Sequence, residues 1–229
     1  MFSLDTCSHS GCGKVAVTVF DDNGEIVPDS LVKGDHYCID HIADKQEFSA
    51  RVIDYIKNHD KIVGLCAPNI HIADLDFTGK KFYGCNFQQC IFSNIHSENF
   101  RSRISSFDFA VFSDCNLIKS NFQFTSFAGA AFSHVLFTDS DLIHNTFCGI
   151  KSVQSSFDDS DLYNSRFIRA ELSDTSFRNC NIKKANFLEI KRENVSFNLS
   201  NTREAMFSLD IESDEAKKKA DSSNAAKPE

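Results

Sequence analysis

The sequence lacks the long apolar runs that cross membranes, since no stretch of about 18 apolar residues occurs in it. Its first five residues contain neither a basic segment nor an apolar run, so we expect no secretory signal. A Gly-rich phosphate loop, a nucleophile elbow and an HExxH motif are also absent. These absences argue against a membrane protein and against the enzyme classes that use those motifs, and we expect a protein that is not an enzyme.

A strong net charge is missing as well: 24 Lys and Arg residues against 32 Asp and Glu residues give a formal net charge of −8. Nine cysteines, an odd number, occur without a secretion signal. This combination indicates a reducing compartment, and we expect the cytoplasm.

What the sequence does contain is a five-residue period from Ile72 to Phe207. Of the 28 residues at this spacing, which we call central positions, 17 are Phe and six are Leu or Ile. The residue two before each central position is usually small, and the residue one before it is often Asn or Asp. A period of five fits neither an α-helix nor a β-strand, so the pattern indicates an internal repeat.

Segments such as Cys115-Asn116-Leu117, Ser140-Asp141-Leu142 and Ala185-Asn186-Phe187 carry this motif, which resembles that of the pentapeptide repeat proteins. The resemblance implies an all-β solenoid: a right-handed, four-sided parallel β-helix with four pentapeptides in each coil. It also implies that the central residue and the small residue point inward. For residues 62–210 we expect about seven coils of 20 residues.

The 20-residue coil can be tested on the sequence, because residues 20 apart should then stack in columns. One such column is Phe throughout: Phe87, Phe107, Phe127, Phe147, Phe167, Phe187 and Phe207. Most polar central positions follow a large residue two before, as Ile95 precedes Ser97 and Phe100 precedes Ser102. The same holds for Ser152 and Arg192, which follow Ile150 and Ile190. A close-packed interior requires this kind of compensation.

Residues 1–61 lack the period and predict a small α+β zinc-binding module. Cys7 and Cys12 form a first pair, a hairpin is expected between Lys14 and Val27, and Cys38 and His41 form a second pair before a helix over residues 43–59. This order resembles a treble-clef-like zinc finger, and a Cys3His set is a common structural zinc site. His9 and His36 are competing ligands, and the alternative is that the four residues bind no metal.

We expect this module to cap the β-helix, because the first coil of a repeat protein exposes unpaired backbone groups and one end of its core. Residues 62–70 are expected to form a join or a ragged first coil. Residues 211–229 are charged, lack an apolar stripe and predict a disordered tail. The terminal coil, with Met206, Phe207 and Leu209, is a candidate homodimer contact, since related proteins often dimerise at such an end.

The predicted function is a non-enzymatic scaffold for a protein partner. The alternative implied by the resemblance is a DNA mimic that binds a type II topoisomerase (gyrase). Residues 62–210 have a net charge of only −2, which does not suit a DNA mimic. Nucleic-acid binding is not expected from the N-terminal module either, because residues 1–61 carry a net charge of −5.

One acidic cluster is a candidate partner-binding site. In a 20-residue coil Asp139 stacks on Asp159, and Asp141 stacks on Asp161, with Asp158 alongside. Like charges this close repel one another, so the cluster predicts a docking patch for a basic protein segment or a weak divalent-cation site. The alternative is that Asp141 and Asp161 merely fill the usual Asn/Asp position of the repeat.

Overall fold

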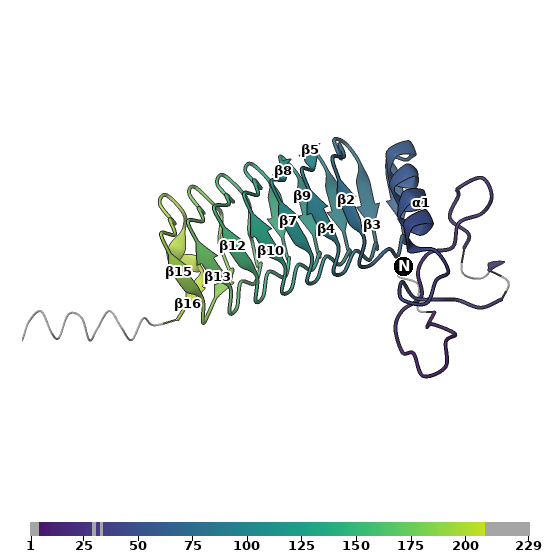
Figure 1. Ribbon diagram of the computed structural model, residues 1–229. Coiled ribbons are helices and arrows are strands. Elements are labelled where there is room, and N and C mark those ends of the chain that lie inside the picture. Colours follow the sequence, from purple (N-terminus) through teal and green to yellow (C-terminus); the bar gives the residue numbers. More distant parts are fainter. Residues whose placement is uncertain (1–4, 29–30, 33, 209–229) are drawn as a thin grey trace, which may run out of the picture.

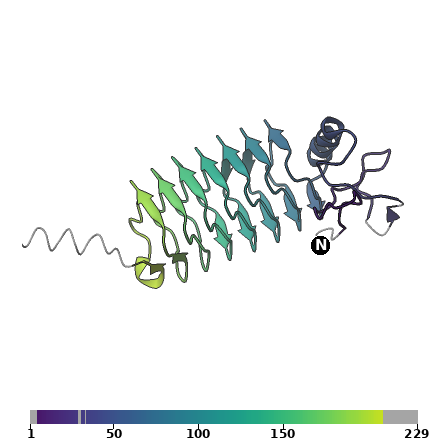
Figure 2. The same cartoon turned by 60° about the horizontal axis from the view of Figure 1, so that its bottom comes forward.

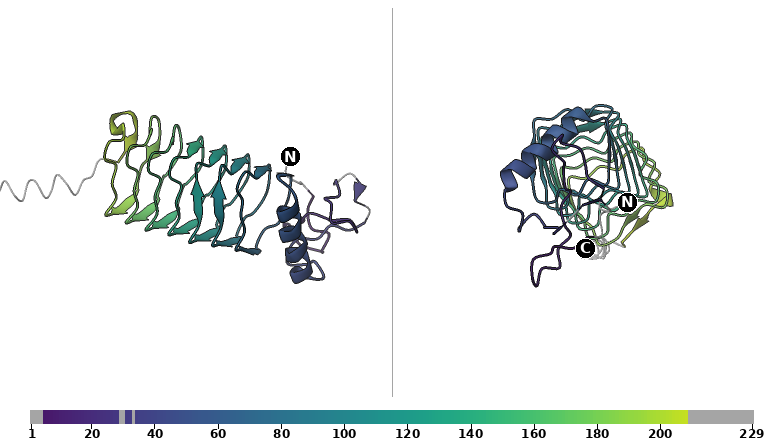
Figure 3. Two further views of the ribbon diagram at one scale, coloured as in Figure 1. Left: turned by 90° about the horizontal axis from the view of Figure 1, so that it is seen from above. Right: turned by 90° about the vertical axis from the view of Figure 1, so that its right-hand side faces the viewer.

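The computed structural model describes residues 5–28, 31–32 and 34–208 of the chain. It shows a parallel β-helix whose coils follow one another in a row, with helix α1 beside the first coil (Figure 1). The row keeps the same stacking when viewed from another side (Figure 2). Viewed along its axis the β-helix has a four-sided outline (Figure 3).

Helix α1 (Lys45–Asn58) begins where Asp44 caps it. One carboxylate oxygen of Asp44, Oδ1, accepts hydrogen bonds from the backbone N–H groups of Gln46 and Glu47, at 2.8 and 2.9 Å. Phe48, Val52 and Ile56 form its buried face, as their spacing predicts. The helix ends at Asn58, because His59 adopts an extended backbone. It lies within the range of 43–59 expected from the sequence.

The predicted hairpin before the helix forms only in part. Phe20 and Ile26 make an antiparallel bridge around a turn in which Gly24 has a φ of +81°. Asp21 Oδ1 accepts the backbone N–H groups of Asn23 and Glu25, both at 2.9 Å. Between Lys14 and Val27 the structure thus has isolated antiparallel bridges and not the two continuous strands that the sequence predicts.

Short strands form the sides of the coils. The first sheet, which we call the β1 face, consists of β1 (Lys61–Val63), β3 (Lys81–Tyr83), β6 (Arg101–Arg103), β9 (Asn121–Gln123) and β11 (Asp141–Ile143). The second sheet consists of β2 (His71–Ala73), β4 (Ile91–Ser93), β7 (Val111–Ser113), β10 (Ala131–Ser133), β12 (Lys151–Val153), β13 (Glu171–Ser173) and β15 (Lys191–Glu193). The remaining pairs are β5 (His96–Glu98) with β8 (Asn116–Ile118), and β14 (Asn186–Phe187) with β16 (Met206–Phe207), which follows a 3-10 turn, Thr202–Glu204.

The parallel register confirms the 20-residue coil. Ile62 is opposite Phe82, Phe82 is opposite Ser102, and the same offset of 20 residues recurs in every strand pair. Isolated bridges continue the β1 face beyond its strands, from Asp141 to Asp161 and from Asp161 to Asn181. Each column predicted from the sequence is therefore a column of the structure.

The interior is a stack of aromatic rings. In the all-Phe column, consecutive rings lie 4.7–5.6 Å apart between centroids and are within 13° of parallel. Neighbouring columns meet this stack edge-on, as Phe127 meets Phe132 at 5.8 Å. Face-to-face and edge-to-face contacts of this kind add to the gain from burial.

The polar central positions are compensated as expected. Phe100 is 2% exposed and its ring lies 4.9 Å from that of Phe82, in the space beside the small Ser102. The buried Ser102 hydroxyl oxygen lies 3.5 Å from Thr125 Oγ1. Near the last coil Arg192 is exposed, and Ile190, two residues before it, is partly buried against the core. The core thus keeps its density while its few polar groups find hydrogen-bond partners.

The first coil is regular, and the expectation of a ragged one was wrong. Ile62 and Ala67 occupy central positions and are fully buried, and Cys66 forms a bridge with Asn86 of the next coil. The period escaped notice because Ala67 is small, whereas Leu65 and Ile70, two before central positions, are large. The pattern is inverted here, but the inward volume is conserved.

The N-terminal module caps this first coil. Thr18 donates its backbone N–H to the carbonyl oxygen of Cys66 at 2.9 Å, and its hydroxyl oxygen accepts the Cys66 N–H at 2.7 Å. The Lys80 ammonium, on a largely buried side chain, donates to the carbonyl oxygens of Lys57, in the last turn of α1, and of His59, which caps it. Apolar residues of α1 belong to the same core as the Phe columns.

In the described part of the chain, no helix is both long and apolar enough to span a bilayer. The predicted tail at residues 211–229 lies outside the described residues.

Candidate metal centre

Two tight turns carry the four predicted ligands. Cys7 donates its backbone N–H to the Lys14 carbonyl oxygen at 2.9 Å, and Cys12 donates to that of His9 at 3.0 Å. Gly11 allows the chain to turn between them, with a φ of +78°. A second turn, closed by a hydrogen bond from His41 N–H to Cys38 O at 2.9 Å, directly precedes α1.

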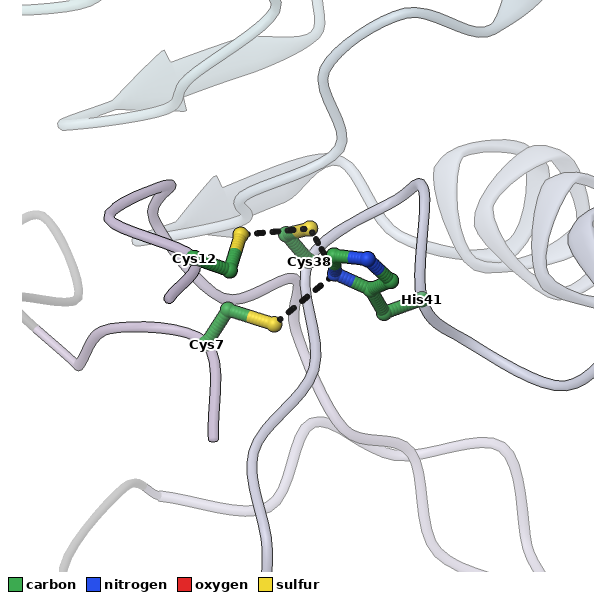
Figure 4. A group of neighbouring side chains, drawn as sticks. All are labelled: Cys7, Cys12, Cys38 and His41. Atoms are coloured by element: carbon green, nitrogen blue, oxygen red, sulfur yellow. Dashed lines mark hydrogen bonds between the residues drawn. The ribbon is translucent and has the colours of Figure 1, made fainter. Parts of the chain in front are cut away.

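The structure brings the four predicted ligands together (Figure 4). Their ligand atoms all lie within 4.8 Å of one another. His41 Nδ1 is 3.3 Å from both Cys7 Sγ and Cys38 Sγ, and Cys12 Sγ is 3.7 Å from Cys38 Sγ. Within the described residues, this is the one group of three or more His, Cys, Asp or Glu side chains close enough to share an ion.

These distances fit a tetrahedral ion. With metal–sulfur bonds of about 2.3 Å and metal–nitrogen bonds of about 2.0–2.1 Å, the ligand atoms of a tetrahedral site are separated by about 3.5–3.8 Å. Three of the separations, two of 3.3 Å and one of 3.7 Å, are close to these edges, and the others are no longer than 4.8 Å. Three sulfur donors and one imidazole nitrogen form the donor set of a closed structural zinc site.

The thiols sit in contrasting electrostatic surroundings. Burial alone would raise the pKa of the Cys7 thiol. Hydrogen bonds with the backbones of Cys38 and His9, and with the side chains of His41 and Cys38, outweigh burial and lower this pKa to about 6. For Cys38, burial dominates and raises the pKa. One thiol of the cluster is therefore easily deprotonated, as a ligand to a cation must be.

The two competing histidines are not part of the cluster. The His9 ring stacks on the His41 ring, with centroids 3.9 Å apart and an interplanar angle of 3°. His36 Nδ1 lies 3.4 Å from Asp5 Oδ2. His9 therefore packs against a ligand ring without being a ligand, and His36 is engaged with Asp5.

The acidic cluster is divided between two environments. Asp141 and Asp161 are opposite each other on the β1 face, and each accepts a hydrogen bond from a neighbouring Asn amide in its column, at 2.8 and 2.9 Å. Asp139 and Asp159 are exposed at the adjacent corner, each with a positive φ. These four carboxylates lie at or near the surface of one stretch of the β-helix.

Asp158 differs from the other four. Its side chain is only 12% exposed and pairs with the Arg178 guanidinium, with Oδ2 3.0 Å from Nη2. Its Oδ1 accepts the Arg178 backbone N–H at 2.7 Å and the Ser176 hydroxyl at 2.5 Å. Asp158 therefore links two coils, and its charge is neutralised.

The prediction of acidic columns missed a basic one on the same face. Lys61, Lys81 and Arg101 follow one another in register along β1, β3 and β6. Arg103 lies on the same strand as Arg101. The signal was present in the sequence, because these residues have the same 20-residue spacing that identified the acidic stacks.

Comparisons with known proteins agree with this architecture. Residues 105–142 and 155–187 match the family model for pentapeptide repeats, with eight copies. No curated protein matches the chain.

Several solved structures are similar to the chain. A trypsin-treated variant of QnrB1, a plasmid-mediated fluoroquinolone resistance protein, has 16% identity over 70% of this chain and 88% of its own, with a TM-score of 0.45. The pentapeptide repeat protein Rfr23 from the cyanobacterium Cyanothece 51142 has 12% identity over 41% of this chain, with a TM-score of 0.39. The matched part spans 64% of Rfr23, less than two thirds of its length.

HetL, a pentapeptide repeat protein involved in heterocyst differentiation regulation from the cyanobacterium Nostoc sp. strain PCC 7120, has 13% identity over 69% of this chain and 96% of its own, with a TM-score of 0.26. The five-residue period, its 20-residue register and the family match lead to one conclusion. Residues 105–142 and 155–187 of the β-helix consist of pentapeptide repeats of the kind that this family model describes.

Proposed function

We propose that Cys7, Cys12, Cys38 and His41 hold one structural zinc ion. The two turns that carry them lie before and after the partly formed hairpin, so a shared ion would fasten them together next to α1. Four protein donors complete a tetrahedron and leave no position for substrate, which argues against a catalytic zinc. The site would therefore stabilise the cap.

We propose further that the protein is a non-enzymatic scaffold that binds another protein. The observation that carries this proposal is the filled interior: every Phe from the middle of the all-Phe column is buried, and Phe127, Phe147 and Phe167 are 0% exposed. A solid core leaves no room for a small-molecule site inside the coils. Recognition then depends on the outward side chains of flat faces.

The acidic surface formed by Asp139, Asp141, Asp159 and Asp161 is the proposed docking site, which we call the acidic patch. A basic protein segment fits it because it would relieve the repulsion between carboxylates stacked at the coil spacing of about 4.8 Å. All nine cysteines lie among the described residues and none is in a disulfide, which suits a reducing compartment, and we propose the cytoplasm. A divalent-cation site in the acidic patch has less support. Among the described residues, three or more potential metal ligands come close together only in the Cys/His cluster.

The test is quantitative affinity capture from the source cells with two matched variants. One replaces the four carboxylates of the acidic patch by Asn. The control removes the same number of charges from exposed positions elsewhere, by Asp74→Asn, Asp114→Asn, Asp174→Asn and Glu193→Gln. We expect only the acidic-patch variant to lose a partner. Equal capture by wild type and both variants would refute the docking site.

The alternative function, a DNA mimic that binds a type II topoisomerase, is weaker. A DNA mimic requires a strongly negative surface, whereas Lys61, Lys81 and Arg101 form a basic column on the β1 face. A supercoiling assay with purified gyrase separates the two functions. Our proposal predicts no inhibition at low micromolar protein, and inhibition there would favour the alternative.

A further inference from the structure

The β1 face is electrically polarised along the axis of the β-helix. Its outward column reads, in consecutive coils, Lys61, Lys81, Arg101, Asn121, Asp141, Asp161 and Asn181. Within the described residues, no carboxylate forms an ion pair with any of the three cations. Cations therefore occupy the part of the column next to the cap, and carboxylates occupy the part beyond Asn121.

The charges change sign symmetrically about Asn121, so Arg101 and Lys81 each have a carboxylate at the same distance on the other side. Arg101 and Asp141 are each one coil from it, in opposite directions, and Lys81 and Asp161 are each two coils from it. A second copy that faces this column with its axis reversed places Arg101 against Asp141 and Lys81 against Asp161. Because the arrangement is two-fold symmetric, each of these pairs forms twice.

We propose that two copies of this chain associate side by side and antiparallel through the β1 face, with the two-fold axis at strand β9. The proposal rests on the acidic patch as a docking site and specifies what fills it: the basic half of the same face in a second copy. Charge complementarity of this kind fixes both register and direction. Within one chain the stacked like charges of the column repel one another. Across the interface each of Lys81, Arg101, Asp141 and Asp161 faces an opposite charge.

An apolar edge coincides with the same axis. Phe124 directly follows β9 and is 60% exposed, and Ile104, one coil before it, is 61% exposed. Under the proposed symmetry, Phe124 faces its own counterpart, and Ile104 faces His144, whose ring already stacks on Phe124 at 5.0 Å. Two exposed large apolar side chains at the centre of the interface supply the apolar contact that charge pairs alone lack.

The association should be weak and sensitive to salt. Strands of three residues, about 10 Å long, in coils about 4.8 Å apart, give a face of roughly 340 Å² over seven coils. Stable complexes bury about 800 Å² on each partner. Charge pairs on such a small face are screened when the Debye length falls from about 10 Å at 0.1 M salt to about 3 Å at 1 M.

Sedimentation velocity over a range of concentrations up to about 0.5 mM tests the proposal on the full chain. We expect a dimer in 50 mM NaCl whose dissociation constant rises about tenfold or more in 500 mM NaCl. A monomer at all concentrations in 50 mM NaCl would overturn the proposal. It would leave the docking function intact if the acidic-patch variant still loses another partner.

Charge reversal supplies the decisive comparison. Arg101→Glu and Asp141→Lys should each abolish self-association, because each homodimer then opposes like charges twice. An equimolar mixture of the two variants should restore the dimer, since every cross-pair in the mixed dimer is again attractive. Each variant also removes like-charge neighbours within its own column, so both should fold. A mixture that stays monomeric, or single variants that dimerise like wild type, would refute the geometry.

Two phenylalanines provide a matched control for the apolar edge. Phe124→Ser should weaken the dimer about tenfold or more, whereas Phe109→Ser should leave it unchanged. Phe109 is similarly exposed, at 64%, but it projects from a different corner and covers Gly129. Equal effects of the two substitutions would place the contact elsewhere, for example at the terminal coil with Met206 and Phe207, and would refute an interface on the β1 face.

Discussion

Truncation of Phe127 is the most direct probe of the stacked core. Its ring is 0% exposed and lies between Phe107 and Phe147, at 5.2 and 5.1 Å. The rings of Phe122 and Phe132 approach it edge-on, at 5.4 and 5.8 Å. Phe127→Ala removes all of these contacts at once and leaves a cavity that the rigid coils cannot close.

The expected loss of unfolding free energy is about 3–5 kcal/mol, the usual range for a buried Phe→Ala substitution. Phe207→Ala should cost less, about 1–2 kcal/mol, because Phe207 is only partly buried and has ring neighbours on one side, Phe187 and Phe197. Phe109→Ala, at an exposed corner, should change stability by less than about 1 kcal/mol.

Denaturant unfolding followed by circular dichroism measures all three values. We predict that the loss of unfolding free energy is largest for Phe127→Ala, clearly smaller for Phe207→Ala and smallest for Phe109→Ala. If Phe127→Ala and Phe207→Ala destabilised the protein equally, the stability would not depend on depth within the stack, and the account of the core would be wrong.

Three further predictions concern the cap, the acidic patch and the thiols. Protein purified without chelator should contain one zinc ion per chain by metal analysis, and Cys38→Ser should lose it while His36→Ala retains it; a metal-free wild type would contradict the assignment. Replacing Asp139, Asp141, Asp159 and Asp161 by Asn should raise the melting temperature by a few degrees at low salt, because repulsion is removed, and this gain should shrink in 1 M NaCl; a lower melting temperature would contradict the repulsion. Burial raises the pKa of the Cys85, Cys90 and Cys180 thiols to about 12. At pH 8 the native protein should therefore be alkylated much faster at the partly exposed Cys148 than at these three, as mass spectrometry of the labelled peptides would show, and equal rates would contradict their burial.

The repeat could be predicted from sequence because its signal is local and regular. A Phe every five residues defines the inward direction, and the 20-residue columns follow from the number of sides. The pattern breaks at the first coil, where Ala67 occupies a position that is usually Phe, and Leu65 and Ile70 fill the volume from neighbouring positions. Packing conserves volume across a coil, whereas a pattern compares one position at a time.

The candidate site was only partly predictable for a different reason. Spacing identified Cys7, Cys12, Cys38 and His41, but it could not exclude His9, because the stacking of His9 on His41 depends on the folded turns. Spacing also placed Asp158 beside the acidic stacks, although its carboxylate turns to Arg178 and Ser176 of the next coil. Side-chain direction within a coil requires the structure. The domain boundaries at residues 61 and 210 stay predictions.

The central claim is that a metal-held cap closes the first coil of a pentapeptide-repeat β-helix. Hydrogen–deuterium exchange of the full chain, before and after zinc is removed with a chelator, tests it most directly. We predict that amides of β1 and β2, next to α1, exchange faster after zinc removal, while those of β10 and β12 keep their rates. Unchanged exchange at β1 and β2 in protein that has lost its zinc would contradict the account.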